Sequence, residues 1–505
     1  MKISLISTST YPGDQGLRVI SSCLKKAGHE VQMIFMVMEE DYSKVYSLKV
    51  LRQLGILCKD SDLVGISCMA STSIRASQII NYVKEVLEKP VVLGGVHATI
   101  SPESCVKKAD YVIVGEGEEA IVELANKLEK KQKVDKIKNL WTKKFRNPVR
   151  KLVENLDKFP FPDFDIENHY ILDKNIRKFK ERDFHGMIFY QTERGCPHSC
   201  TYCINRRLKE INKGKGKVLR TNSVNHIIKD LVRLKKKFPN TKTFDIRDET
   251  FFVRDYETIK KFCSEYKKKV GLRWKCLASP MNMDEKKLNV MINAGMTDII
   301  VGIQGSERSN FEVYKRYIKN EDIMKCAKIL NKYKRKIAVM YDVITCNPYE
   351  NKEDIVKMIR FLQKLPKPYY LSVNNLVFFL GSELYTTARK DGIIKEEIDS
   401  AFNLNYWDRW KHIKLKRKNE YLVLILNLMR GVSTKRRFGL MPDFLINFLL
   451  KKKRVEFHLK HKRMTYFAGS IIGVGDFFRE HVLKPTYRSL PTGFKSWYDK
   501  VRYRV

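Results

Sequence analysis

The sequence predicts an α/β protein with three parts: a doubly wound parallel sheet, a partial (β/α) barrel, and a mostly helical, basic C-terminal region. Short β-branched runs alternate with helical stretches over residues 1–130, and the same alternation resumes over residues 186–395. Residues 396–505 show helical periodicity and a large excess of Lys and Arg. Alternation of β and α at this spacing is typical of parallel sheets covered by helices. With 505 residues, the chain is long enough for two or three domains.

Five strands are expected within residues 1–130. They are the runs KISLIS, EVQMIFM, LVGISC, PVVLGG and YVIVGE. Helices are expected between them, and the first of these ends at Gly28, as a helix C-terminus often does. Glycine and small polar residues follow several of the strands. In open α/β sheets ligands bind at the carboxyl ends of strands, so the sequence predicts a ligand site there.

Residues 131–185 are polar and are expected to form a linker, with a stretch punctuated by prolines at Asp157–Asp165. From Met187 onward six further strands are expected, with amphipathic helices between them. They are MIFYQTE, TFDIRDE, RWKCLAS, DIIVGIQ, IAVMYDVIT and YLSVNNLVFF. Six such units predict a partial barrel over residues 186–395. Its active site is expected where the loops leave the strands.

The net charge of +40 is unevenly distributed along the chain. Residues 1–125 contain 13 Lys and Arg against 15 Asp and Glu, whereas residues 401–505 contain 24 against 7. A basic surface attracts nucleic acid, anionic lipid or anionic substrates, but it is also common as a simple solvated face. The N-terminus lacks the pattern of a signal peptide, and the longest apolar run, Tyr421–Met429, is far short of the ~20 residues of a spanning helix. A cytoplasmic, reducing setting is therefore expected, where clustered cysteines more often bind metal than pair.

Three of the eleven cysteines crowd into the stretch ERGCPHSCTYC: Cys196, Cys200 and Cys203. They directly follow the first predicted barrel strand. Three thiolates can hold three corners of a 4Fe-4S cluster and leave the fourth iron open for a reactant. Zinc is the simpler alternative, but a structural zinc site needs a fourth ligand. His198 lies inside so short a segment that its coordination would strain the loop.

The C-x3-C-x2-C spacing after a first barrel strand resembles the radical S-adenosylmethionine (SAM) superfamily. The resemblance extends from about Met187 to Ile394 and implies a 4Fe-4S cluster on the three cysteines with SAM beside it. The positions that match the family's SAM-binding motifs are Tyr202, Asp248, Glu249, Gln304, Ser306 and Glu307. Two segments depart from the family pattern. Asn347-Pro348-Tyr349-Glu350 lacks the usual glycine, and Leu380-Gly381-Ser382 stands where Pro-Gly-Thr is usual.

The segments GISCMASTSIRAS, VVLGGVHAT and VIVGEGEEAI precede this barrel in that order. This arrangement resembles the Rossmann-like cobalamin-binding domain of cobalamin-dependent radical SAM enzymes. The matching positions, implied to contact cobalamin, are Ser67, Thr72, Gly94, Gly95, Gly115, Glu116 and Gly117. The Asp-x-His-x-x-Gly signature of enzymes that ligate cobalt by histidine is absent, so no protein histidine is expected on the cobalt. His97 is expected to be a turn residue.

The resemblance implies a radical mechanism. SAM binds the open iron, one electron cleaves it to a 5′-deoxyadenosyl radical, and this radical takes a hydrogen from an unactivated carbon. Methylcobalamin then supplies a methyl group. The implied function is methylation, or a related modification, of a small-molecule substrate, with electrons from a flavodoxin or ferredoxin type of donor. The basic tail leaves room for an anionic or lipid-like substrate and for peripheral membrane contact, and nucleic acid is not expected as a partner.

Other functions use related scaffolds. A methylthiotransferase acting on tRNA would explain the basic charge, but it needs three further cysteines at strand ends in its first domain. Here Cys23, Cys58 and Cys105 are predicted in or after helices, and Cys68 alone follows a strand. A non-enzymatic cobalamin or cluster sensor fits less well, because the motif is intact and the second strand ends in acidic residues. A radical SAM cyclase or rearrangement enzyme stays open.

Overall fold

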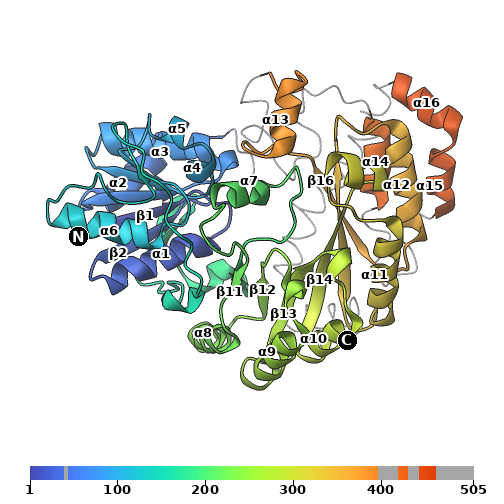
Figure 1. The fold of residues 1–505 in the computed structure, drawn as a ribbon, viewed down its shortest axis with the longest axis horizontal. Coiled ribbons are helices and arrows are strands. Elements are labelled where there is room, and N and C mark those ends of the chain that lie inside the picture. Colours follow the sequence, from blue (N-terminus) through green and yellow to red (C-terminus); the bar gives the residue numbers. More distant parts are fainter. Residues whose placement is uncertain (39–43, 396–418, 430–442, 462–505) are drawn as a thin grey trace.

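The computed structural model describes residues 1–38, 44–395, 419–429 and 443–461 (Figure 1). An N-terminal α/β part lies beside a barrel part, and helix α7 (Ile204–Ile211) lies between them. The sequence places three aromatic residues near the start of the basic C-terminal region. These residues, Tyr406, Trp407 and Trp410, lie outside the described part of the chain.

The N-terminal sheet has eight strands in the order β6-β5-β4-β3-β1-β2-β7-β8. Their bounds are β1 (Lys2–Ser7), β2 (Glu30–Phe35), β3 (Leu63–Ser67), β4 (Val91–Gly94), β5 (Tyr111–Ile113), β6 (Leu140–Trp141), β7 (His169–Asp173) and β8 (Asn175–Lys178). The six central strands are parallel, and β6 and β8 pair antiparallel at the two edges. All five strands predicted for the first domain are confirmed.

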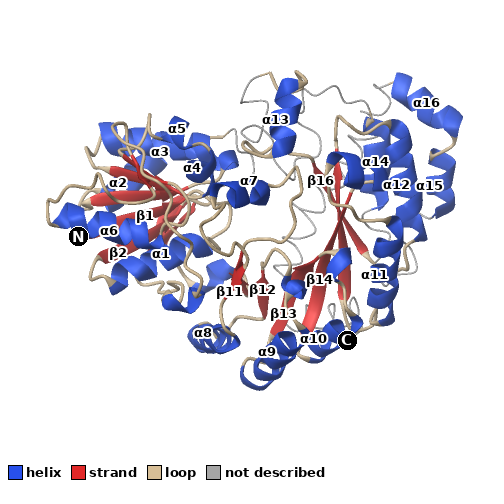
Figure 2. Cartoon of the chain, viewed as in Figure 1, coloured by secondary structure: helices blue, strands red, loops and turns tan. Residues whose placement is uncertain are grey.

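Helices cover both faces of this sheet (Figure 2). They are α1 (Gln15–Lys26), α2 (Leu48–Cys58), α3 (Ser73–Glu85), α4 (Val96–Ile100), α5 (Pro102–Cys105) and α6 (Glu118–Glu129). Successive side chains of a strand point to opposite faces. Accordingly, Leu5 of β1 packs in the cluster that holds α1 and α6, whereas its neighbour Ile6 packs in the cluster that holds α2 and α3. The doubly wound arrangement is therefore confirmed.

The segment 131–185 differs from the expected linker because it supplies the three strands β6, β7 and β8. β7 pairs with β2 through His169 and Met33, both of which are buried. These strands have two to five residues each and lie in a polar segment without a run of β-branched residues, so the sequence did not reveal them. Their physical role is to pair the two edges that β2 and β5 would otherwise leave open. The domain boundaries drawn from the sequence remain a prediction.

The second sheet has six parallel strands in the order β16-β15-β14-β13-β12-β9, so β9 and β16 form its two edges and the barrel is partial. The strands are β9 (Met187–Tyr190), β12 (Thr243–Ile246), β13 (Arg273–Ala278), β14 (Met296–Gln304), β15 (Ala338–Thr345) and β16 (Tyr370–Asn375). The helices that follow them are α8 (Val224–Lys237), α9 (Tyr256–Lys269), α10 (Glu285–Asn293), α11 (Asn320–Lys332) and α12 (Lys352–Lys364). All six predicted strands are confirmed. A separate two-stranded antiparallel sheet of β10 (Glu193–Arg194), which follows β9, and β11 (Arg220–Thr221) encloses α7 in the chain between its strands.

The described part of the C-terminal region is helical. Its helices are α14 (Glu420–Leu428), α15 (Asp443–Leu449) and α16 (Lys452–Lys460), and α13 (Glu383–Lys390) precedes it at the end of the barrel range. Helix α14 contains the most apolar run of the chain, and its residues Leu422 and Ile425 are fully buried in the same cluster as Ile359 of α12. This run is therefore part of the core. In the part of the chain that the structure describes, no helix is both long and apolar enough to cross a membrane.

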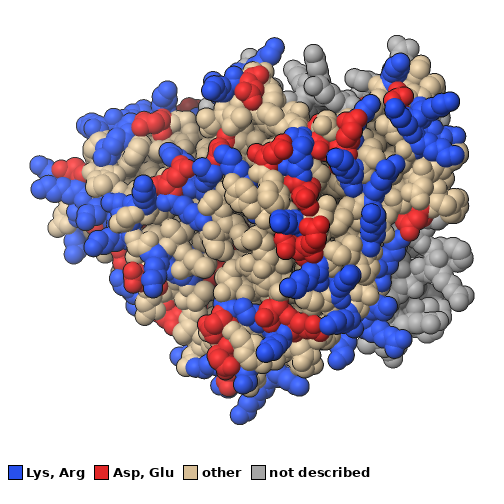
Figure 3. Space-filling model, turned by 45° about the vertical axis from the view of Figure 1, so that its right-hand side comes forward, with Lys and Arg blue, Asp and Glu red and all other residues tan. Residues whose placement is uncertain are grey.

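Lys and Arg side chains are spread over the face of the molecule drawn in Figure 3, with Asp and Glu between them. Many of the charges are paired, as in the surface ion pairs of Lys332 with Glu285 and Lys367 with Asp443. Positive charge by itself therefore does not mark a binding surface on this protein.

Candidate active site

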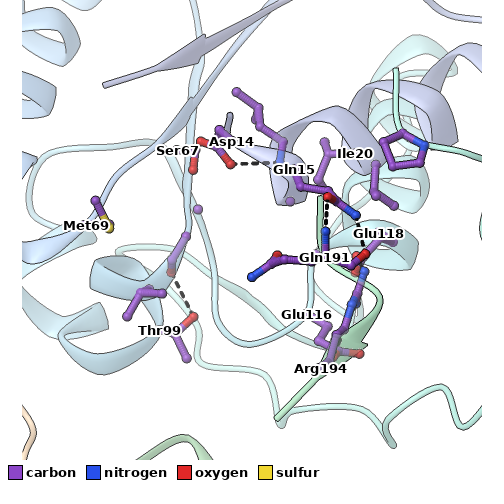
Figure 4. Close-up of a pocket in the computed structure, with 18 of the residues that line it drawn as sticks. Asp14, Gln15, Ile20, Ser67, Met69, Thr99, Glu116, Glu118, Gln191 and Arg194 are labelled. Carbon is purple, nitrogen blue, oxygen red and sulfur yellow. Dashed lines mark hydrogen bonds and ion pairs between the residues drawn. The ribbon is translucent and has the colours of Figure 1, made fainter. Parts of the chain in front are cut away.

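A cavity of about 780 Å³ lies between the two parts of the molecule. Its walls come from the carboxyl ends of β1, β3, β4 and β5 on one side and from residues that follow β9 and β12 on the other (Figure 4). This is the edge at which open α/β sheets bind ligands, and the volume is near the upper end for small-molecule sites. The two parts of the chain therefore share one cavity.

The glycines after β4 bring the backbone to the cavity wall. A Cβ atom at Gly94 would meet no atom within 4 Å, so this position faces open space. Gly95 has φ of +94°, and a Cβ there would lie 2.7 Å from the carbonyl oxygen of Cys68, so only glycine fits. The hydroxyl of Thr99 donates to the carbonyl of Gly95 (2.9 Å) and accepts from the N–H of Gly115 (3.0 Å). Thr99 thereby ties together the loops that follow β4 and β5.

Ser67 and Thr72 also lie at this edge, as predicted. The hydroxyl of Thr8, after β1, lies 3.1 Å from the carbonyl oxygen of Ser67 and 2.8 Å from the hydroxyl of Thr72. Thr72 is buried and lines the cavity, and its hydroxyl also holds the loop after β1 through Thr8. The loop that connects β1 to α1 lines the cavity too and was missed from the sequence. Its run of Ser, Thr and Gly (STSTYPGDQG) directly after a strand was the signal that could have revealed it.

Glu116 links the two parts of the molecule. Its carboxylate lies 2.5 Å from the Arg220 guanidinium and 3.3 Å from that of Arg194, which also pairs with Glu118 (Figure 4). Burial alone would raise the pKa of Glu116, but Arg220 and Arg194 together hold it below its usual range. The residue predicted as a cobalamin contact thus also holds the first domain to the barrel.

A second link is made by two glutamines at the cavity wall. The side chain of Gln15, at the start of α1, donates to the carbonyl of Gln191 (2.8 Å) and accepts from its N–H (2.6 Å). Gln191 directly follows β9. This amide therefore satisfies both backbone groups of Gln191, which would otherwise face the cavity.

Removing the charge of Glu116 is expected to destabilise the protein. Arg220 is 7% exposed, so Glu116→Gln leaves a buried guanidinium with incomplete pairing, which costs about 3 kcal/mol. The matched change Glu103→Gln breaks an exposed pair with Arg146 and should cost less than about 1 kcal/mol. Urea unfolding of both variants measures this difference. Equal stabilities would show that the interdomain cluster contributes nothing.

The three cysteines lie in a loop that follows β9 and β10. Cys200 is 8% exposed, Cys196 and Cys203 are partly exposed, and all three are free thiols. The loop is anchored across the barrel mouth, because Thr201 donates its N–H to the carbonyl of Tyr314 (3.1 Å) and accepts from the N–H of Leu384 (2.9 Å). These bonds fix the backbone between the second and third cysteines.

The first half of the same loop is held by one lysine. The ammonium group of Lys209, on α7, donates to the carbonyl oxygens of Pro197 (2.8 Å) and His198 (2.6 Å) and to the hydroxyl of Ser199 (3.1 Å). All three residues between Cys196 and Cys200 are therefore tied to α7. A fixed loop presents its thiolates at set positions, which is what a cluster requires.

The chemistry of the thiols also fits a cluster. Burial raises the pKa of Cys196 to about 11 and the pKa of Cys203 to about 12, so a cation is needed to stabilise the thiolates there. Among the residues that the structure describes, no three His, Cys, Asp or Glu side chains converge as ligands of a single metal ion. A 4Fe-4S cluster takes each thiolate on a separate iron, so its ligands lie further apart.

The structure separates the two acidic residues predicted after the second barrel strand. Asp248 is fully buried and accepts from the N–H groups of Thr192 (2.6 Å) and Glu193 (3.1 Å). It also pairs with the Arg254 guanidinium at 2.9 Å. Asp248 therefore holds the backbone that leads into the cysteine loop and does not line the cavity.

Glu249 lines the cavity and is accessible from it. Its position deep between the two domains raises the pKa of the Glu249 carboxyl, an effect that a hydrogen bond from Asn205 opposes. Of the two predicted acidic residues, Glu249 is the one placed to meet a ligand.

Substitution should distinguish these two roles. We expect Asp248→Asn to lower the free energy of unfolding by about 3 kcal/mol, because Arg254 keeps its buried charge with Glu193 as its one remaining ion-pair partner among the described residues. Glu249→Gln should change it by less than about 1 kcal/mol and instead weaken SAM binding. Urea unfolding and equilibrium SAM binding measure the two effects. A stable Asp248→Asn variant with weak SAM binding would reverse the assignment.

The remaining predicted SAM positions do not line the cavity: Tyr202, Gln304, Ser306 and Glu307. Tyr202 packs edge-on against Tyr314, with ring centroids 5.0 Å apart. Gln304 ends β14 with φ of +73°. Glu307 accepts from the N–H of Asn320 (2.6 Å) and lines a second cavity of about 490 Å³. The structure therefore brings Glu249, and not this group, to the shared cavity.

The segment of residues 347–350, which departs from the family pattern, makes hydrogen bonds within the barrel. Asn347 donates to the hydroxyl of Tyr314 (3.1 Å), and Glu350 accepts from the hydroxyl of Ser309 (2.6 Å). Burial raises the pKa of Glu350 to about 7. Both side chains are buried and contact neighbouring elements of the barrel.

Two histidines near the cavity have structural contacts. His97 lies in helix α4 and not in the expected turn, and burial lowers its pKa to about 4. His226, on the barrel side, lines the cavity, but its Nδ1 lies 3.7 Å from the Asp157 carboxylate and its ring packs against Phe161. The expectation that cobalt lacks a protein histidine remains a prediction.

Comparison with known families agrees with the two halves of this site. Residues 1–125 match the B12 binding domain, and residues 190–362 match the radical SAM superfamily. The chain is a cobalamin-binding radical SAM enzyme. The cofactors of these two kinds of domain are cobalamin, and SAM with a 4Fe-4S cluster.

Curated relatives of this radical SAM enzyme are distant. An uncharacterized methyltransferase of Pyrococcus horikoshii is 25% identical over 430 residues, which are 80% of this chain and 86% of that protein. The bacteriochlorophyllide d C-8(2)-methyltransferase of Chlorobaculum tepidum is 23% identical over 359 residues, 68% of this chain and 72% of its own.

Two solved structures share the fold. TsrM from Kitasatospora setae, a radical SAM methyltransferase with tryptophan and a SAM analogue bound, has a TM-score of 0.62 at 16% identity and covers 78% of this chain and 77% of its own. The structure of OxsB with aqua-cobalamin and SAM bound has a TM-score of 0.64 at 16% identity. The match covers 95% of this chain and 75% of the OxsB chain. At these identities the likeness shows the fold of this radical SAM enzyme.

Proposed function

We propose that this radical SAM enzyme transfers a methyl group to an unactivated carbon of a small molecule. The observation that carries the proposal is the shared cavity, in which the strand ends of the B12 binding domain face Glu249 and the inner side of α7. Since α7 begins directly after Cys203, the cavity borders the cysteine loop. Both curated relatives described above are named methyltransferases, which supports methyl transfer.

We assign the cofactor contacts as follows. Cys196, Cys200 and Cys203 would hold the cluster, and Glu249 would accept a hydrogen bond from the SAM amino group. The strand-end positions that would contact cobalamin are Ser67, Thr72, Gly94, Gly95, Gly115, Glu116 and Gly117. When bound, these groups supply a 5′-deoxyadenosyl radical and a transferable methyl group.

The protein's own residues would position the cofactors and exclude water from the site. Asp248 and Lys209 fix the cysteine loop through backbone groups on either side of Cys196. The Glu116–Arg220 pair and the Gln15–Gln191 bonds hold the two domains together beside the cavity. Contacts that hold the two domains together beside the cavity limit the access of water to a reactive intermediate.

Product analysis tests the proposal. Anaerobically reconstituted enzyme with cobalamin, a low-potential reductant and SAM carrying a labelled methyl group should release both S-adenosylhomocysteine and 5′-deoxyadenosine. The label should appear in a candidate substrate. Formation of 5′-deoxyadenosine with no methyl transfer to any product would favour the cyclase or rearrangement alternative.

An anionic or lipid-like substrate, or contact with an anionic membrane, is the finer part of the proposal. In the described part of the tail, Phe444, Phe448 and Phe457 are 73%, 40% and 44% exposed. The Arg454 guanidinium lies 3.7 Å from the Phe448 ring centroid, and exposed lysines neighbour it. Apolar and basic side chains on one short helical unit are typical of interfacial contact.

The membrane contact predicts salt-sensitive binding to anionic vesicles, with each nearby Lys or Arg contributing about 1 kcal/mol. Co-sedimentation with phosphatidylserine vesicles measures it. Phe444→Ser with Phe448→Ser should weaken binding, whereas neutral phosphatidylcholine vesicles serve as the control. Equal binding to both vesicle types would rule out the electrostatic part.

A further inference from the structure

Residues 204–217, which we name the α7 segment, follow the third cysteine without a break. The sequence INRRLKEINKGKGK contains six Lys or Arg residues and a single acidic one, Glu210. Cys203 is the N-cap of α7. The densest short run of positive charge next to the site therefore begins at a proposed cluster ligand.

The far end of the α7 segment returns to the same loop. Gly195 has φ of +90°, and a Cβ atom there would overlap the carbonyl oxygen of Val218. The backbone just after Lys217 therefore lies directly against the residue before Cys196. In the middle of the segment, Lys209 reaches the carbonyls of the cysteine loop. The α7 segment therefore contacts the first half of this loop and begins directly after its last cysteine.

Helix α7 forms a wall one helix thick. Asn205, Leu208 and Asn212 lie at helical spacing and line the shared cavity. The opposite side carries Arg207 and Glu210, whose side chains are 45% and 51% exposed. No residue of α7 is fully buried. The outer side therefore presents its charges to solvent while the inner side borders the active site, as its place between the two parts in Figure 1 suggests.

The positive charge of this outer side is largely uncompensated. Arg206 and Arg207 both pair with the one acidic residue of the segment, Glu210, and Arg206 also pairs with Glu383. Lys213 and Lys217 are exposed and make no ion pair with any described residue. Basic side chains occur elsewhere on this protein, so charge alone decides nothing. What distinguishes the α7 segment is that it lies against the cysteine loop.

We propose that the outer side of the α7 segment docks an acidic one-electron carrier protein of the flavodoxin or ferredoxin class. The carrier loses one electron and the cluster gains it, which is the electron that SAM cleavage consumes. An acidic partner is favoured because opposite charge steers docking, and contact here brings the carrier beside a helix that touches the cysteine loop. The inference rests on the proposed function.

Steady-state SAM cleavage by the full-length reconstituted enzyme tests the docking site. The rate is measured against the concentration of reduced flavodoxin, and separately with dithionite. Lys213→Glu combined with Lys217→Glu should raise the flavodoxin concentration needed for half the maximal rate about tenfold or more and leave the dithionite rate unchanged. The matched control is Lys452→Glu combined with Lys453→Glu on α16, which makes the same charge change far from the loop and should behave as wild type.

Several results would overturn the docking site. These are an unchanged flavodoxin dependence, an equal change in the control variant, or a parallel loss of the dithionite rate. Loss of binding to anionic vesicles or to tRNA, with unchanged flavodoxin dependence, would assign the segment to another partner. A wild-type enzyme that cleaves no SAM with dithionite would instead contradict the proposed function.

Discussion

Replacing Cys196, Cys200 or Cys203 by alanine should remove the 4Fe-4S cluster and abolish SAM cleavage. Each thiolate holds a separate iron, and the loop offers no fourth cysteine to take its place. The loop itself should stay folded, because its anchors to Tyr314 and Lys209 use backbone carbonyl and N–H groups. Loss of the cluster is measured by iron and sulfide content and by the visible thiolate-to-iron absorption bands. Loss of SAM cleavage is measured by 5′-deoxyadenosine release.

Cys263→Ala provides the matched control. This cysteine is 3% exposed in α9 and packs in the core, so its loss should cost about 1 kcal/mol of stability and leave the cluster in place. Full iron content in a variant that lacks all three loop cysteines would refute the cluster assignment. Iron loss from Cys263→Ala as well would mean that reconstitution, and not ligation, had failed.

Filling the cavity at Gly94 should block cobalamin. A side chain at this position starts into open space, so Gly94→Phe projects a ring from the strand end where the cofactor is proposed to lie. Cobalamin uptake should fall by about tenfold or more, since a steric conflict of only 1.4 kcal/mol already produces that factor. The free energy of unfolding should change by less than about 1 kcal/mol, because no protein atom is displaced.

Gly94→Ala is the size control and should bind cobalamin nearly as well as wild type. Uptake is read from the absorption spectrum of the purified protein after excess cofactor is removed, and iron content shows that the cluster site is unaffected. Normal uptake by Gly94→Phe would place cobalamin elsewhere. The spectrum of the bound cofactor also tests the prediction that no histidine nitrogen binds cobalt.

Local pattern accounts for most of the fold that the sequence predicted. The strand runs of both sheets are strongly β-branched and apolar, and the helices between them carry one apolar side, so eleven predicted strands could be located. The strands β6, β7 and β8 could not, because they lie in a polar segment that has no comparable run of β-branched residues. They form where an exposed sheet edge offers hydrogen bonds, which is a property of the folded sheet.

The candidate site divides in the same way. The cysteine spacing and the glycines at strand ends are local signals, and Gly95 shows why, since its backbone conformation excludes any other residue. The roles of Asp248 and Glu249 could not be separated from the sequence. They are adjacent, and only the turn of the chain after β12 decides which carboxylate meets Arg254 and which faces the cavity.

The sequence by itself determined the order of the two domains, the ligand edge of the first sheet and the three thiols that mark the second, because each depends on residues close together in the chain. Only the tertiary structure decided that these places share one cavity, that Glu116 joins the domains through Arg220, and that Lys209 holds the cysteine loop. Glu116 and Arg220 are separated by more than one hundred residues. Such contacts arise when whole elements pack, and no local pattern encodes which distant side chains then meet.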